Sequence, residues 1–315
     1  MTARPARVGA IDCGTNTLRL LIADVRPGDP PQLSDVVRRM ETVRLGEGVD
    51  ATGLLASAAL DRASRVLAEY AEALREHDVS AVRMVATSAV RDARNRDDFT
   101  AMVRSHLDVE PDVISGMQEA ALTAAGVVSG LDISEPSLVL DIGGGSTEFV
   151  RSSGDPGRAL GVSTDVGVVR LSERHLHHDP PTLPEADLVR ADTLDAVAQA
   201  REALGDLKGL RVLGVAGTVT TAVGIALGLR RYDSAAIHGA TVSRQQLELV
   251  LEWALQTDTA GRAANPVMHP GRAPVFAAGM LILLTILDEL GAASVTASET
   301  DILDGIALSI RRSER

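Results

Sequence analysis

The sequence predicts an α/β protein built from two related halves. Short apolar segments, which are typical of strands, alternate with longer segments in which Leu and Ala recur at helical spacing. The pattern restarts at residues 130–137, and an Asp-x-Gly motif that follows the first apolar segment recurs after the restart. At 315 residues, the chain is long enough for two domains of ordinary size.

The first half opens with a hairpin. Over residues 7–25, the apolar segments "RVGAID" and "TLRLLIADV" flank the polar turn "CGTN". Leu and Ala at helical spacing predict the first helix, and glycines mark the end of the last one. The elements expected after the hairpin are strands at 36–45, 81–89 and 111–116, and helices at 54–77, 96–107 and 117–131.

The second half also opens with a hairpin, "SLVLDIGGGSTEFVRSS", at residues 137–153. Because prolines cluster after it, we expect a loop at 179–187 that leads into a helix over 188–204. Residues 210–227 read as a strand, a Gly/Thr turn and a helix. Helices at 243–256 and 272–290, and then a strand and a terminal helix, complete the pattern.

The two hairpins align as an internal repeat. Asp12 corresponds to Asp141 and Gly14 to Gly143 at a constant spacing, with apolar segments on both sides. One difference stands out, because Arg19 in the first copy is replaced by Glu148 in the second.

Composition limits the classes of function. The net charge is −12 and aromatic residues make up 2%, which argues against a nucleic-acid-binding protein. The single cysteine, Cys13, fits a reducing compartment, and the longest apolar run, 275–287, is too short to span a bilayer. We therefore expect a cytoplasmic protein that binds neither nucleic acid nor membrane.

The turns of both hairpins have the composition of phosphate-binding loops. Glycine lets successive backbone N–H groups approach an anion, and hydroxyl or amide side chains can add contacts. A tight hairpin is the alternative, but such a turn does not need three glycines followed by two hydroxyl residues. The sequence is neither a Walker A loop nor a dinucleotide-binding motif. The residues predicted to bind phosphate are Gly14, Thr15, Asn16 and Thr17, and Gly143, Gly144, Gly145, Ser146 and Thr147.

Six motifs in a fixed order resemble the exopolyphosphatase/guanosine pentaphosphate phosphohydrolase (Ppx/GppA) family of the actin-like ATPase superfamily. They cover essentially the whole chain and are "AIDCGTNTLRLLIAD", "ATSAVRDARN", "ISGMQEA", "LDIGGGSTE", "GVAGTVTT" and "SETDILDGIAL". The chain is most similar to the short, two-domain actinobacterial form. The resemblance implies two actin/ribonuclease H-like domains, residues 1–128 and 129–300, with an inter-domain cleft. The terminal helix, within 301–315, is expected to pack on the first domain.

The resemblance also implies an activity and a set of roles. The expected reaction is Mg²⁺-dependent hydrolysis of the terminal phosphoanhydride of inorganic polyphosphate, with Mn²⁺ as a possible substitute. Glu119 matches the residue that activates water, and Arg91 matches one that contacts substrate phosphate. Asp141 and Glu148 match the metal ligands, and Asp12 is expected to bind the same metal ion from the first loop, directly or through water.

Alternatives remain open at this point. Guanosine pentaphosphate presents the same terminal phosphoanhydride, so it is an equally suitable substrate. Gln118 stands where many members carry a second acidic residue, which leaves room for a catalytically weak sensor of phosphate ligands. "DILDG" also replaces the commoner "ALREG" near the C-terminus.

A sugar or acetate kinase would need an adenosine pocket that no motif supplies. A homodimer is implied by resemblance alone.

Overall fold

The computed structural model describes residues 6–26, 28, 31–131, 135–152 and 159–310. The chain divides into two compact units, and each contains one β-sheet. The first unit comprises Met1–Ser129 and Thr300–Arg315, and the second comprises Gly130–Glu299. The last residues of the expected terminal helix, 311–315, lie outside the described residues.

The sheet of the first unit has the strand order β3-β2-β1-β4-β5. The first three strands form an antiparallel meander, and β4 and β5 continue the sheet in parallel. Its strands are β1 (Ala6–Cys13), β2 (Thr17–Arg26), β3 (Gln32–Thr42), β4 (Ala81–Ala86) and β5 (Asp112–Val113). Its helices are α1 (Val49–Thr52), α2 (Ser57–Glu76), α3 (Ser88–Asp92), α4 (Arg96–Leu107), α5 (Gly116–Gly130) and α13 (Ile302–Ser309).

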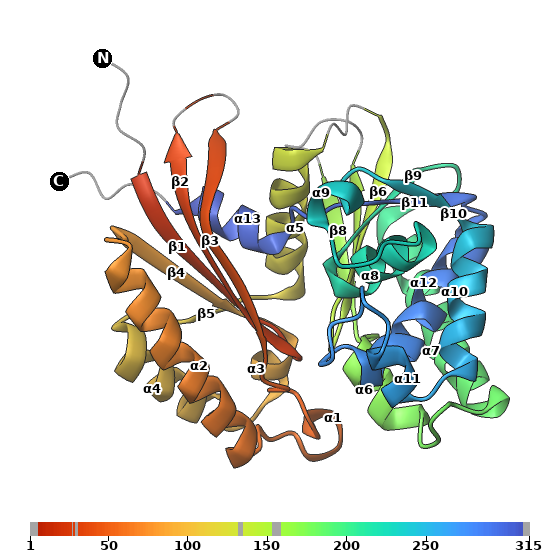
Figure 1. Ribbon diagram of the computed structural model, residues 1–315, viewed down its shortest axis with the longest axis horizontal. Coiled ribbons are helices and arrows are strands. Elements are labelled where there is room, and N and C mark those ends of the chain that lie inside the picture. The colour runs from red at the N-terminus through yellow and green to blue at the C-terminus, as the bar shows by residue number, and fades with distance from the viewer. Residues whose placement is uncertain (1–5, 27, 29–30, 132–134, 153–158, 311–315) are drawn as a thin grey trace. The chain divides into compact units, whose positions relative to one another are not determined.

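Both faces of this sheet are covered. Alternate residues of a strand point to opposite faces, so Ile11 packs with α2 and α4 whereas Ala10 packs with α13. Figure 1 shows α2 and α4 on one side of the sheet and α13 and α5 on the other. The C-terminal helix therefore completes the hydrophobic core of the N-terminal unit.

Helices α5 and α13 approach each other closely enough to require glycine. A Cβ atom at Gly126 of α5 would lie 1.7 Å from the carbonyl oxygen of Asp301. Reciprocally, a Cβ atom at Gly305 of α13 would lie 1.9 Å from the carbonyl oxygen of Leu122. Any side chain at either glycine would collide with backbone, so the crossing has no room to adjust.

The sheet of the second unit has the order β10-β11-β9-β6-β7-β8. Its strands are β6 (Ser137–Ile142), β7 (Thr147–Ser152), β8 (Leu160–Thr164), β9 (Arg211–Val215), β10 (Thr241–Ser243) and β11 (Ser294–Ala297). Its helices are α6 (Val168–His175), α7 (Leu183–Leu204), α8 (Ala216–Ala226), α9 (Ser234–Ile237), α10 (Arg244–Gln256), α11 (Thr259–Ala263), η2 (Ala273–Val275) and α12 (Phe276–Leu290). Residues Ala273–Leu290 are long and apolar enough to cross a membrane, but 78% of this stretch is buried, so it is the core helix of this unit.

The structure confirms the internal repeat. Strands β8-β7-β6-β9-β11 repeat the order and directions of β3-β2-β1-β4-β5. Asp12 pairs across the hairpin with Arg19, and Asp141 pairs with Glu148 in the same register. In both turns the first glycine donates its N–H to the carbonyl three residues later, at 3.0 Å.

Several expected boundaries are wrong. β3 spans residues 32–42 and not 36–45, and the strand expected at 81–89 ends at Ala86, so that Ser88 begins α3. Two further differences have a clear local cause. Helix α7 begins at Leu183 and not at residue 188, because Thr182 and Glu185 form a capping box and Pro184 is tolerated in the first turn. The expected Gly/Thr turn after β9 does not form either. Helix α8 begins directly at Ala216, whose φ of 61° redirects the chain in one residue.

A fully buried arginine ties the second unit together. Arg262, on α11, is 2% exposed and donates to the carbonyls of Ala254, Thr257 and Ala273. Its remaining nitrogen, Nη2, lies 2.8 Å from Oδ1 of Asp179, just before the Pro-rich segment. Nη2 also donates to the hydroxyl oxygen of Thr259 at 3.0 Å. One side chain therefore satisfies five acceptors.

We expect Arg262→Met to lower the free energy of unfolding by roughly 2–3 kcal/mol, because methionine leaves several buried carbonyls without a donor. Urea denaturation measures this change. The matched control is Arg190→Met, which removes an exposed ion pair with Asp187 and should cost no more than about 0.5 kcal/mol. Equal losses in the two variants would contradict the assignment.

Candidate active site

The turn between β1 and β2 is held rigidly by its neighbours. The carbonyl of Thr15 accepts a hydrogen bond from Gly46, and the carbonyl of Asn16 accepts from both Val43 and Arg44. The Thr15 hydroxyl lies 2.8 Å from the hydroxyl of Ser88, the first residue of α3. These contacts fix the first loop and use the buried hydroxyl of Thr15. Phosphate binding by this loop remains a prediction.

Asp12, at the end of β1, is neutralised within the hairpin. Its carboxylate is buried, and Oδ2 accepts from Nε and Nη2 of Arg19 at 2.8 and 2.6 Å. Burial raises the pKa of Asp12, and Arg19 offsets part of that rise. Because Asp12 already has a cation beside it, we expect it to act through water or through Arg19 and not as a direct metal ligand.

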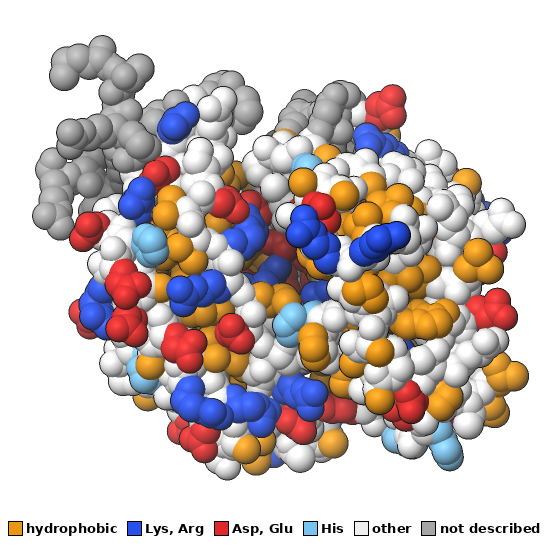
Figure 2. Space-filling view, in the orientation of Figure 1, with side chains coloured by type: hydrophobic (Ala, Val, Ile, Leu, Met, Phe, Trp, Pro, Cys, Tyr) orange, Lys and Arg blue, Asp and Glu red, His pale blue; other side chains and the backbone are white. Residues whose placement is uncertain are grey.

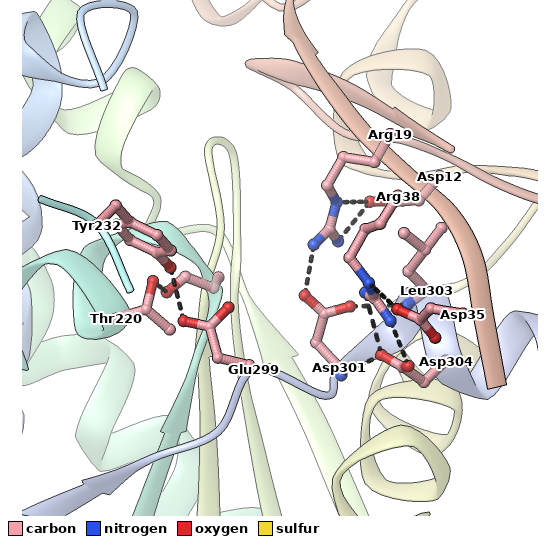
Figure 3. A network of polar contacts seen from close by, with 11 residues as sticks. Asp12, Arg19, Asp35, Arg38, Thr220, Tyr232, Glu299, Asp301, Leu303 and Asp304 are labelled. Atoms are coloured by element: carbon pink, nitrogen blue, oxygen red, sulfur yellow. Dashed lines mark hydrogen bonds and ion pairs between the residues drawn. The ribbon is translucent and has the colours of Figure 1, made fainter. Parts of the chain in front are cut away.

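The same arginine reaches the N-terminus of α13 (Figure 3). Arg19 Nη1 pairs with Oδ2 of Asp301, which caps α13 by accepting from the N–H of Leu303 at 2.9 Å. The second acidic residue of this turn, Asp304, is 2.6 Å from Nη2 of Arg38. The unusual "DILDG" segment thus supplies two carboxylates to two arginines of the first sheet.

Sequence reasoning did not assign a role to Asp301 or Asp304. The available signal was the Asp-x-x-Asp spacing before an apolar helix, which resembles a capping box. Their arginine partners lie more than 260 positions earlier, so no local pattern could reveal them.

The structure brings the two predicted catalytic residues together. Glu119 lies in the first turn of α5 and is 8% exposed, and Arg91 projects from α3. Arg91 Nη1 lies 3.2 Å from Oε2 of Glu119 and 3.0 Å from the carbonyl of Ile114. Both the guanidinium and the helix N-terminus attract negative charge. The carboxylate is therefore oriented by two separate elements.

Gln118 caps the same helix. Its Oε1 accepts from the N–H and hydroxyl of Ser115 at 2.9 and 3.1 Å, and its own N–H donates to the Ser115 hydroxyl. A glutamate could make the same capping contacts. The departure from the family pattern thus preserves the start of α5.

The start of helix α6 packs on the glycine run of the second hairpin, residues 143–145. The amides of residues 168–170, at the start of α6, donate to the carbonyls of Gly143 and Gly144. A Cβ atom at Gly167 would lie 2.4 Å from the carbonyl oxygen of Gly144. The small residues thus permit backbone to pack on backbone. These hydrogen bonds and this close packing hold the backbone of the loop in place.

The hydroxyl residues of this loop differ in availability. Thr147 is fully buried and donates its hydroxyl proton to the carbonyl of Val166 at 2.6 Å. The carbonyl of Ser146 accepts from Gly143. Thr147 therefore anchors the loop, and its predicted phosphate contact would have to use its backbone or its hydroxyl oxygen.

Two buried carboxylates face each other beside this loop. Asp141 and Glu148 are directly opposed on β6 and β7 and are 8% and 1% exposed. Ser163 donates its hydroxyl to Oε1 of Glu148 at 2.7 Å. Like charges at opposed positions destabilise a hairpin unless a cation lies near them. Carboxylate oxygens are also the ligands that Mg²⁺ prefers.

Asp141 and Glu148 fit a metal site that water and substrate oxygens complete, and not one that protein ligands enclose. Among the described residues, no group of three or more His, Cys, Asp or Glu side chains could enclose a metal ion. Mg²⁺ commonly takes one or two protein carboxylates and fills its other positions with water and phosphate oxygens. Asp141 and Glu148 match that arrangement.

The duplicated α/β sheets and the similarity to known enzymes identify a phosphoanhydride hydrolase. The chain belongs to the Ppx/GppA phosphatase family, whose model matches residues 21–314.

Known proteins resemble the chain over nearly its whole length. It is 44% identical to exopolyphosphatase 2 of Mycobacterium tuberculosis, with 96% of this chain and 98% of that protein covered. It is 28% identical to guanosine-5'-triphosphate,3'-diphosphate pyrophosphatase of Vibrio atlanticus, over 97% of this chain and 59% of that protein. The crystal structure of an exopolyphosphatase-like protein matches with a TM-score of 0.90 at 36% identity, over 96% of this chain and 98% of the other.

Proposed function

We propose that the protein is a Mg²⁺-dependent exopolyphosphatase that releases orthophosphate from the ends of inorganic polyphosphate. The observation that carries the proposal is the opposed pair of buried carboxylates, Asp141 and Glu148, beside a glycine-rich loop. Similarity to a named exopolyphosphatase along almost the entire chain supports polyphosphate as the substrate.

We assign to Glu119 the role of orienting the attacking water. Phosphoryl transfer passes through a loose transition state, so a carboxylate that orients water contributes more than a strong base. Arg91 already contacts Glu119, and we assign its remaining donors to the transferred phosphoryl group. Arg91 would then hold the phosphoryl group close to Glu119, the carboxylate that orients the water.

Asp141 and Glu148 are the residues that would hold Mg²⁺, or Mn²⁺ in its place. The ion would neutralise charge on the substrate phosphates. Glycine amides of each loop would bind phosphate oxygens, and the hydrogen-bonded backbone of each loop keeps its own donors in place.

We expect Asp141→Asn to have opposite effects with and without metal. Without metal, it should raise the free energy of unfolding by about 0.5–1 kcal/mol, because one of two opposed charges is removed. With Mg²⁺, the variant should lose the stabilisation that the wild type gains by binding. Thermal unfolding in EDTA and in Mg²⁺ measures both effects.

The matched control is Asp12→Asn, at the equivalent position of the first hairpin. That substitution removes one of the two carboxylate partners of the half-buried Arg19, so it should lower stability with or without metal. If Asp141→Asn behaves like Asp12→Asn, the metal assignment fails.

The activity itself is tested by phosphate release from long-chain polyphosphate and from guanosine pentaphosphate, each with Mg²⁺ and with EDTA. We expect Mg²⁺-dependent release from polyphosphate. Absence of release from both substrates would overturn the proposed function.

Hydrolysis of guanosine pentaphosphate is the second candidate, because a pyrophosphatase of that class is among the relatives. A faster reaction with the nucleotide in the same assay would favour it. The catalytically weak sensor receives less support, because Gln118 keeps the helix cap that positions the next residue, Glu119.

We further propose a cytoplasmic homodimer. Cys13 is a buried free thiol, as expected in a reducing compartment, and the dimer rests on family resemblance. Size-exclusion chromatography with light scattering tests the oligomeric state.

A further inference from the structure

An arginine beside the first loop has a backbone conformation that arginine rarely adopts. Arg44, two residues after β3, has a φ of 49°. The other described non-glycine residues with positive φ are Asp78, Asp108 and Ala216. Asp tolerates this region through local hydrogen bonds, whereas a long side chain is held there at a cost of order 1–3 kcal/mol.

Glycine would remove this strain, and the same segment uses glycine where it needs it. Gly48 and Gly53 follow within nine positions and have φ values of 72° and 66°. The segment therefore places an arginine at a position where glycine would fit the backbone better. A strained conformation at a position suited to glycine indicates a functional role for the Arg44 side chain.

The Arg44 side chain does not stabilise the fold. Arg44 is exposed, and within the described residues its guanidinium takes part in no ion pair or hydrogen bond. Its neighbour Arg62, by contrast, donates to the carbonyls of Val43 and Arg44 and pairs with Glu47. The Arg44 side chain is thus an uncommitted cation on a protein of net charge −12.

The backbone of Arg44 is fixed to the predicted phosphate loop. Its N–H and that of Val43 both donate to the carbonyl of Asn16, at 2.9 and 3.0 Å. Two residues further, the N–H of Gly46 donates to the carbonyl of Thr15 at 2.8 Å. These bonds impose the strained φ and hold the base of the arginine against the loop. Figure 2 shows basic side chains gathered on the surface near α1 and α3, the elements that flank this segment.

We propose that Arg44 is a phosphate-binding residue that extends the first loop and contacts a phosphate of the substrate other than the one transferred. The inference rests on the proposed function, and it names oligophosphate as the chemistry that this surface recognises. A guanidinium suits the role because it can bind two phosphate oxygens at once. Since the contact is away from the reacting bond, it contributes equally to the bound substrate and the transition state.

The test is Arg44→Gly. For polyphosphate hydrolysis, we expect KM to rise about tenfold with kcat nearly unchanged, the effect of one lost charged contact. The melting temperature should not fall, because glycine relieves the strain. Arg44→Lys keeps the charge but not the paired donors, so its KM should lie between those of Arg44→Gly and the wild type.

Two control variants distinguish the loss of the Arg44 contact from a general effect of glycine at a positive φ and from the loss of any exposed arginine. Asp108→Gly introduces glycine at another positive φ, at the end of α4, and Arg96→Ala removes another exposed arginine. Neither should change KM. An unchanged KM in Arg44→Gly, or an equal rise in Arg96→Ala, would overturn the proposal.

A binding measurement tests the role of Arg44 independently of hydrolysis. In the Glu119→Gln background, calorimetry should show weaker binding of long-chain polyphosphate when Arg44→Gly is added. If the wild type hydrolyses neither substrate, the proposed function fails while this comparison still decides the role of Arg44. Equal dissociation constants with and without Arg44 would refute it.

Discussion

Glu119→Gln should lower kcat for phosphate release from polyphosphate by about 10²–10⁴-fold with little change in KM. Glutamine keeps the shape of the side chain and can still contact Arg91, but it cannot accept a proton from water or carry negative charge. The loss should therefore fall on the chemical step. Initial rates over a range of polyphosphate concentrations measure both parameters.

The neighbouring residue provides the control. Gln118→Glu restores the second acidic residue of the family pattern while keeping the capping contacts with Ser115. We expect it to change kcat by less than about tenfold, because this exposed side chain is committed to the helix cap. A wild-type rate in Glu119→Gln, or a large gain in Gln118→Glu, would move the catalytic role away from Glu119.

Gly126→Val should destabilise the first unit by at least about 3 kcal/mol, more than ordinary overpacking of a core. The added side chain would meet the backbone of Asp301 at the crossing of α5 and α13, and backbone cannot rotate away as a side chain can. Displacement of α13 would also separate Asp301 from Arg19. Both stability and substrate binding should therefore suffer, as urea denaturation and KM measurements would show.

The adjacent substitution Ala125→Val isolates the crossing. Ala125 is exposed on the same helix, so valine there changes helix propensity by roughly half a kcal/mol and meets no backbone. Similar losses in the two variants would indicate a general sensitivity of α5 and no special contact with α13.

Features with a local or repeated pattern could be predicted from the sequence. The two hairpins, the Asp-x-Gly repeat and the alternation of strands and helices follow from apolar periodicity, and the structure confirms them. Even so, the start of α7 was misplaced. The two prolines at residues 180 and 181 suggested a long loop, whereas the capping box at Thr182 starts the helix just after them.

Contacts between distant segments could not be predicted in this way. The repeat located Arg19 opposite Asp12, but Asp301 joins them only because α13 returns to the first sheet. Similarly, the glycines at 143–145 suggested an approaching ligand, and nothing nearby in the sequence indicated that α6 packs on them as well. The strained φ of Arg44 depends on hydrogen bonds to a loop almost thirty residues earlier.

The position of α13 has a consequence for synthesis on the ribosome. Residues Val8, Ala10 and Leu21 line a sheet face whose cover includes Ile302, Leu303 and Ile306. The nascent N-terminal unit must therefore wait, with that apolar face incompletely covered, until the whole second unit has been translated. During this interval the face is available to chaperones or to unwanted association. A chain that ends at residue 299 should be held in that state permanently.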